Sequence, residues 1–137
     1  MTELLIVDDD DLLRSWTERV VREGGYACDA ATNASDAREL LTHDSYDLVL
    51  LDINMPDEPG IELLSHIRSD HPNAAVVVTG EDDPHLAMAT IELGAFGYMA
   101  KPVGSGQLLI SVANALNHRS ATHADSRAET SPRRDGS

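Results

Sequence analysis

The sequence contains little cysteine, few aromatic side chains and almost no lysine. Cys28 is the single cysteine among 137 residues, which excludes an internal disulfide and argues against a structural zinc site. No apolar run reaches the ~18 residues that a membrane span requires, and the N-terminus lacks the basic stretch that opens a secretory signal. We therefore expect a cytoplasmic protein that does not engage a membrane.

Basic residues are also few compared with acidic ones. Ten Lys and Arg stand against 24 Asp and Glu, which gives a formal net charge of −14. This balance disfavours direct binding of nucleic acid and favours cations or basic proteins as partners. Residues 120–137 hold no Leu, Ile, Val or aromatic side chain, so they cannot bury enough apolar surface to offset their ordering entropy. We predict one domain over residues 1–119 and a disordered C-terminal tail over residues 120–137.

Short apolar runs alternate with segments of helical periodicity along the domain. The predicted strands lie at residues 4–7, 26–31, 48–51, 74–78 and 96–100, and apolar residues at helical spacing follow each of them. This alternation with short connections predicts right-handed crossovers and a parallel sheet with helices on both faces. If the strand over 26–31 is an edge strand, the strand order is 2-1-3-4-5. The expected fold class is α/β, a doubly wound five-stranded parallel sheet of the flavodoxin-like type.

Polar residues end the other four strands: Asp8 with Asp9, then Asp52, Thr79 and Lys101. Ligands of doubly wound sheets bind outside the strand carboxyl ends where the winding reverses, so Asp8, Asp9 and Asp52 should meet there. Helix capping explains one or two aspartates of the run at 8–11. Three converging carboxylates, however, repel one another unless a cation offsets them. Oxygen ligands without cysteine or histidine suit Mg²⁺.

Lys101 is the one lysine among the ten basic residues. A compact ammonium on a flexible stem can reach an anion in a crowded site, although it could also serve only to neutralise the acids. Thr79 offers a hydroxyl at the same rim, although a threonine that ends a strand is also ordinary. Together these groups predict a site for a phosphoryl group, with Asp52 as the nucleophile and with Mg²⁺ and Lys101 neutralising the phosphoryl oxygens.

Ordered motifs are found at residues 5–10 (LIVDDD), 50–56 (LLDINMP), 60, 78–80 (VTG) and 94–102 (GAFGYMAKP). This set resembles the receiver domain of two-component response regulators, over about residues 3–118. The resemblance implies that a histidine kinase or phosphotransfer protein donates a phosphoryl group to Asp52. It also implies a phosphorelay protein rather than an enzyme: Mg²⁺-dependent self-phosphorylation and self-dephosphorylation, with a surface change that signals in trans to a downstream protein effector.

The resemblance also assigns roles to single residues of the site. Asp8 and Asp9 would bind Mg²⁺ together with Asp52, and Asn54 would add its backbone carbonyl as a metal ligand. The phosphoryl group itself would be contacted by the two polar residues at the ends of the fourth and fifth strands, which are Thr79 and Lys101.

Further positions are implied to transmit or end the signal. In the family, the threonine turns toward the phosphoryl group and an aromatic residue on the fifth strand rotates inward; Tyr98 matches that residue. Asn54 and Glu81 match positions that tune dephosphorylation, and their polar side chains predict a short phosphoryl lifetime. Val103 departs from the pattern because many receivers carry phenylalanine there, and with Gly104 it predicts looser packing.

Two other functions compete with this interpretation. A phosphatase with an aspartyl nucleophile would want a second acid two residues after Asp52, where Asn54 stands, and a cap segment that the sequence lacks. A receiver-like module that is never phosphorylated usually has lost an acid or the lysine, and here all are present. No effector domain fits after residue 119 unless the chain is a fragment, and the oligomeric state stays open.

Overall fold

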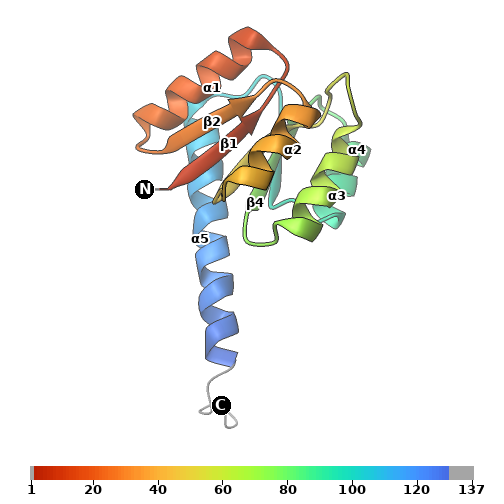
Figure 1. Cartoon of the computed structure of the whole chain (residues 1–137). Helices are drawn as coiled ribbons and strands as arrows, with labels where there is room; N and C mark the ends of the chain where they lie inside the picture. The colour runs from red at the N-terminus through yellow and green to blue at the C-terminus, as the bar shows by residue number, and fades with distance from the viewer. Residues whose placement is uncertain (1, 130–137) are drawn as a thin grey trace.

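Five strands and five helices alternate in the computed structural model, which describes residues 2–129 (Figure 1). The strands are β1 (Glu3–Val7), β2 (Ala27–Ala31), β3 (Leu48–Asp52), β4 (Ala75–Gly80) and β5 (Gly97–Ala100). The helices are α1 (Asp11–Glu23), α2 (Ala34–His43), α3 (Gly60–Asp70), α4 (Pro84–Glu92) and α5 (Ser105–Glu129). All strands pair in parallel in the order β2-β1-β3-β4-β5. The predicted fold class and strand order are thus confirmed.

Helices cover both faces of the sheet, with α1 and α5 on one side and α2, α3 and α4 on the other (Figure 1). Successive side chains of a strand point to opposite faces, so each strand supplies both layers. Leu5 and Val49 belong to the apolar cluster beneath α2 and α3, whereas Leu4 and Leu50 belong to the cluster beneath α1 and α5. Every residue of β3 is buried, as expected for the central strand of a doubly wound sheet.

Side-chain caps begin three of the helices at the residues that the sequence suggests. Asp10 accepts a hydrogen bond from the backbone N–H of Leu13 at 3.1 Å, and Asn33 accepts one from that of Asp36 at 2.7 Å. Asp83 caps α4 in the same way. Such caps satisfy backbone donors that have no partner within the helix. Because Asp10 alone caps α1, capping does not account for the other aspartates of the run.

Helix α5 is the element that differs most from the expectation. Its sequence predicts a helix from Leu108 to Leu116, whereas α5 runs from Ser105 to Glu129 and so extends into the segment predicted to be a disordered tail. Alanine, arginine and glutamate in that segment have good helix propensity even without an apolar face to pack. Residues 130–137 of the predicted tail lie outside the described residues. Within the described part of the chain, neither α5 nor any other helix has an apolar stretch sufficient to cross a bilayer.

The entry to α3 depends on a glycine. A Cβ on Gly60 would collide with the carbonyl oxygen of Ile53 and lie 2.7 Å from the Cα of Ile53. Gly60→Ala should therefore lower the free energy of unfolding by about 1–3 kcal/mol, as overpacking does, measured by urea denaturation. Gly106→Ala is the matched control in the first turn of α5, where an added Cβ meets no heavy atom within 4 Å. Equal stabilities of the two variants would contradict the close approach at Gly60.

Candidate functional site

Three carboxylates converge at the carboxyl edge of the two central strands. Val7 of β1 pairs with Leu51 of β3, so the residues that follow them lie side by side. Carboxylate oxygens of Asp8, Asp9 and Asp52 all lie within 4.8 Å of one another; we call these three residues the acid cluster. Asp8 and Asp52 are only 5% and 3% exposed, while Asp9 is exposed. The structure therefore brings together the three acids that the sequence places at one edge.

Hydrogen bonds fix the two buried carboxylates. Asp8 Oδ1 accepts a hydrogen bond from the backbone N–H of Asp10 at 2.9 Å, and Asp52 Oδ1 accepts one from that of Asn54 at 3.1 Å. The guanidinium of Arg14 donates to the backbone carbonyl of Asp8 at 3.0 Å. These contacts hold the carboxylates in defined orientations, as a metal or phosphoryl site requires.

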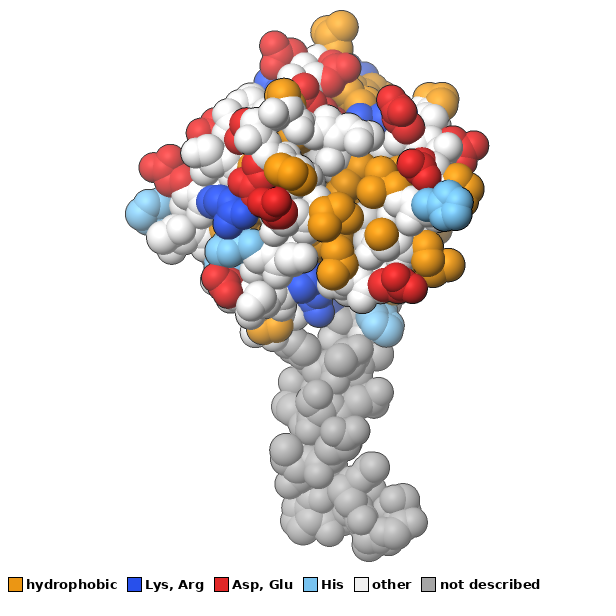
Figure 2. Space-filling model, turned by 90° about the vertical axis from the view of Figure 1, so that its right-hand side faces the viewer, with side chains coloured by type: hydrophobic (Ala, Val, Ile, Leu, Met, Phe, Trp, Pro, Cys, Tyr) orange, Lys and Arg blue, Asp and Glu red, His pale blue; other side chains and the backbone are white. Residues whose placement is uncertain are grey.

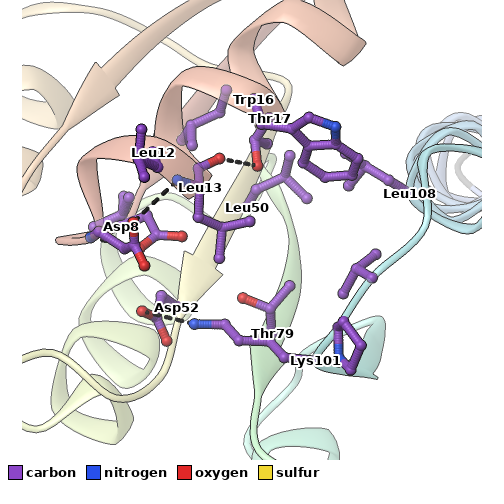
Figure 3. Close-up of a pocket in the computed structure, with 15 residues that line it drawn as sticks. Asp8, Leu12, Leu13, Trp16, Thr17, Leu50, Asp52, Thr79, Lys101 and Leu108 are labelled. Carbon is purple, nitrogen blue, oxygen red and sulfur yellow. Dashed lines mark hydrogen bonds and ion pairs between the residues drawn. The ribbon is translucent and has the colours of Figure 1, made fainter.

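Lys101 and Thr79 complete the polar edge, as the sequence predicts (Figure 3). The Nζ atom of Lys101 lies 3.2 Å from Asp52 Oδ2. Thr79 on β4 is the register partner of Asp52, and it lines the same cavity as Asp8, Asp52 and Lys101. A carboxylate, a hydroxyl and an ammonium therefore lie at one end of the same cavity.

The acid cluster carries more negative charge than its neighbours offset. The pKa of Asp8 is raised from its usual 3.8 to about 6: burial is the largest cause, the nearby Asp52 and Asp9 add to it, and the Asp10 backbone N–H and Lys101 oppose it. Three carboxylates thus stand against one ammonium. Their oxygen-only ligand set fits a hard divalent cation such as Mg²⁺, which takes one or two carboxylates and keeps several waters.

Tyr98 lies next to the end of the strand that carries Thr79. Its hydroxyl donates a hydrogen bond to the backbone carbonyl of Glu81 at 2.6 Å. A Cβ on Gly80 would collide with this hydroxyl, so a glycine at that position is what lets the Tyr98 side chain lie against β4. Burial of the hydroxyl raises the pKa of Tyr98, and the charge of Asp83 raises it to a smaller extent.

The segment between β3 and α3 is tied to α2 by two acids to which the sequence assigned no role. The Asp57 carboxylate accepts hydrogen bonds from the backbone N–H groups of Ala34 and Ser35 at 3.2 and 3.3 Å. Glu58 makes a two-pronged ion pair with Arg38. Both partners lie about twenty residues away in sequence, and the only local signal is an acidic pair within a turn. These contacts hold the segment that begins with Asn54, whose side chain is exposed.

Residues 4–113 match the family model described as the response regulator receiver domain. The chain belongs to this family. It is 34% identical over 128 residues to the transcriptional regulatory protein PmrA of Pectobacterium parmentieri, covering 93% of this chain and 57% of that protein. It is 35% identical over 116 residues to the response regulator protein PilR of Pseudomonas aeruginosa, covering 84% of this chain and 26% of that protein. The receiver chain thus spans only part of the length of these relatives.

Solved receiver structures have the same fold. A CheY-like receiver domain protein from Methanospirillum hungatei superimposes with a TM-score of 0.85 at 25% identity, covering 89% of this chain and 98% of that one. NtrX from Brucella abortus gives a TM-score of 0.88 at 26% identity, covering 93% of this chain and 30% of that one. The predicted family is therefore confirmed, and phosphorylation-driven signalling in two-component systems is its general function.

Removing one charge of the acid cluster should stabilise the metal-free protein. Asp8→Asn keeps the oxygen that accepts from Asp10 and should raise the free energy of unfolding by about 1–3 kcal/mol at pH 7.5 in EDTA. Because the folded-state pKa of Asp8 is raised, its contribution to stability is present below pH 3.8 and is lost as the pH rises through about 6. The gain in the variant should therefore grow between about pH 4 and 6 and then level off.

Urea denaturation at several pH values measures this difference. Asp82→Asn, which removes an exposed carboxylate outside the acid cluster, serves as the matched control and should change little. A loss of stability in Asp8→Asn at pH 7.5 would contradict the account of the cluster.

Proposed function

We propose that this receiver accepts a phosphoryl group on Asp52 from a histidine kinase or phosphotransfer protein. The observation that carries the proposal is the buried Asp52 carboxylate, 3.2 Å from Lys101 Nζ and adjacent to two further acids. A carboxylate so placed can act as a nucleophile toward phosphorus while the neighbouring cations neutralise the incoming charge. The chain would then act on itself rather than on a separate substrate.

Asp52, Lys101 and Thr79 would each contribute one part of the phosphoryl transfer. An oxygen of Asp52 forms the new bond to phosphorus as the donor's phosphorus–nitrogen bond breaks, which leaves an aspartyl phosphate and a free donor histidine. The ammonium of Lys101 pairs with one phosphoryl oxygen, which means that it moves from Asp52 Oδ2 to the new group. The hydroxyl of Thr79 donates to another oxygen. Positioning and charge neutralisation supply most of the catalysis in such a transfer.

The acid cluster would hold Mg²⁺, and the backbone carbonyl of Asn54 would add a neutral ligand. When bound, Mg²⁺ neutralises the developing charge on the phosphoryl oxygens and relieves the repulsion among the carboxylates. Asp57 and Glu58 hold the segment that carries Asn54, so this ligand is fixed by contacts outside the acid cluster.

Phosphorylation would change the surface through Thr79 and Tyr98. Thr79 would turn toward the phosphoryl group, and Tyr98 would leave the Glu81 carbonyl and rotate inward. Exposed apolar side chains lie on α4 and just before β5: Met88, Ile91 and Phe96 are 59%, 42% and 37% exposed. Figure 2 shows hydrophobic side chains among acidic ones on the side of the molecule that carries α3 and α4. A downstream protein effector would bind in trans on the surface of α4, β5 and α5.

The lifetime of the phosphoryl group would be set by two exposed polar side chains. Asn54 follows the phosphoacceptor by two residues, and Glu81 follows Thr79 by two; both are exposed. Polar groups at these places admit and orient the attacking water. We expect a short lifetime.

The phosphoacceptor can be tested by intact mass after incubation with Mg²⁺ and acetyl phosphate. The wild type should gain one phosphoryl group, and both Asp52→Asn and wild type pretreated with EDTA should gain none. Asp82→Asn is the matched control and should react like the wild type. An equal gain in Asp52→Asn would contradict the assignment.

Rapid hydrolysis could hide the product, so beryllofluoride, which mimics a stable acyl phosphate, provides a second measurement. With Mg²⁺ it should shift the fluorescence of Trp16, which lines the same cavity as Asp52. No mass gain and no fluorescence shift together would leave a receiver that acts without phosphate as the better description.

If Thr79 and Tyr98 move together, the NMR response of Tyr98 to beryllofluoride should depend on Thr79. Beryllofluoride with Mg²⁺ should shift the NMR resonances of the Tyr98 ring, because the hydroxyl gives up its hydrogen bond to Glu81. In Thr79→Ala the shift should fall by half or more although beryllofluoride still binds. Thr90→Ala is a control threonine on α4, where the hydroxyl donates to Ala87 within its own helix. Unshifted Tyr98 resonances in the wild type would contradict the switch.

A further inference from the structure

A cavity of about 660 Å³ extends from the acid cluster between α1 and the start of α5 (Figure 3). Its volume falls within the range of small-molecule sites, which is roughly 300–1,000 Å³. One end is polar and contains Asp8, Asp52 and Lys101. The walls away from this end are mostly apolar, and their main side chains are Leu13, Trp16, Leu50, Val103 and Leu108.

Val103, which follows Lys101 and Pro102, lines this cavity together with Trp16 and is only half-buried. The sequence singles out this position because many receivers carry a phenylalanine there. A larger side chain at position 103 would therefore take up part of the cavity volume.

The apolar walls offer water little to bind. Of the polar side chains on these walls, the Thr17 hydroxyl donates to the backbone carbonyl of Leu13 at 2.9 Å, and Asp10 accepts a hydrogen bond from the backbone N–H of Leu13 at 3.1 Å. Among residues 2–119, whose side chains the structure describes, the one buried side-chain nitrogen or oxygen without a hydrogen-bond partner is Nε of Arg119, which does not line the cavity. A stable buried water needs two to four polar partners. Apolar groups of a ligand would therefore displace only weakly held water.

The charge at the polar end determines the ligand that fits. The acid cluster presents three carboxylates, and Lys101, the ammonium among them, is already paired with Asp52. An anionic head would be repelled by the cluster, whereas a cationic head would be attracted. We propose that this cavity binds a small organic cation, with its ammonium against the acid cluster and an aromatic or branched apolar body between Trp16 and Leu108.

Occupancy by such a cation would compete with Mg²⁺. Both cations would use the carboxylates of Asp8 and Asp52, and two cations at one small cluster repel each other. The ligand would thus prevent phosphorylation by excluding the metal. This inhibitory consequence rests on the proposed function, whereas binding in the absence of metal does not.

The test uses 4-phenylbutylamine as the probe, titrated into the full chain in EDTA and followed by the fluorescence of Trp16, the single tryptophan. Butylamine has the same head without the aromatic body, and 4-phenylbutyrate has the body with the opposite charge. Each should bind at least about tenfold more weakly, a difference of about 1.4 kcal/mol or more. Equal affinity for either comparison compound, or no binding of the probe, would overturn the proposal.

Variants at the wall locate the probe. Val103→Phe should fill the cavity and weaken binding of 4-phenylbutylamine about tenfold or more, and Val103→Leu should give an intermediate loss if the larger change prevents folding. Ile110→Phe is the matched control on α5, where the side chain is 63% exposed and lies outside the cavity; its affinity should equal that of the wild type. Unchanged affinity in both Val103 variants would overturn the location.

Competition between Mg²⁺ and 4-phenylbutylamine is the last measurement. Increasing Mg²⁺ should weaken the apparent affinity for 4-phenylbutylamine in proportion to metal occupancy. If the affinity is independent of Mg²⁺, the head does not lie at the acid cluster and the proposal is wrong. Failure of the proposed function would give a different result. The protein would not be phosphorylated by acetyl phosphate even when 4-phenylbutylamine is absent, yet it would still bind 4-phenylbutylamine in EDTA.

Discussion

The mutual repulsion of three carboxylates at one sheet edge is the constraint on which this receiver depends. Asp8, Asp9 and Asp52 are brought within 4.8 Å of one another because β1 and β3 are neighbours in the sheet. Two backbone N–H groups and the ammonium of Lys101 offset only part of this charge. Burial raises the pKa of Asp8, the charges of Asp52 and Asp9 add to that rise, and the same excess of negative charge attracts a cation. A site that is unfavourable when empty and favourable when loaded is suited to a reversible signal.

The surrounding fold keeps these charges together. The two central strands are buried on both faces by apolar side chains, so the acids cannot separate without disturbing the core. The segment after β3 is tied to α2 through Asp57 and Glu58. Tyr98, in contrast, is half-buried, and its hydroxyl makes one hydrogen bond, to the Glu81 carbonyl. The buried strands and the tied segment therefore position the chemistry, whereas the Tyr98 hydroxyl would give up one hydrogen bond in the proposed rotation.

Much of the fold and of the site could be predicted because both follow from local patterns. Buried strands are short apolar runs that end in polar residues, and in a parallel sheet those ends share one edge. The positions of Asp8 and Asp52 at the ends of two such runs therefore predict that the two carboxylates lie side by side. Contacts between distant segments could not be predicted. Two examples are the ion pair of Glu58 with Arg38 and the hydrogen bond from Tyr98 to Glu81. Both depend on the conformations that the loops adopt in the folded protein. The sequence predicts a shorter last helix because residues 120–129 have no apolar face, whereas α5 continues to Glu129. The sequence predicts loose packing at Val103, but that this residue lines one cavity with Trp16 depends on how α1 and the segment before α5 come together in the fold.

The free energy of unfolding as a function of Mg²⁺ concentration tests the central claim most directly. Specific binding to the folded state should raise this free energy logarithmically above the dissociation constant, by about 2.7 kcal/mol at one hundred times that concentration. The rise should be absent with choline chloride at matched ionic strength and reduced in Asp52→Asn. Equal effects of Mg²⁺ and choline chloride on the wild type would contradict the view that the three carboxylates form a cation site.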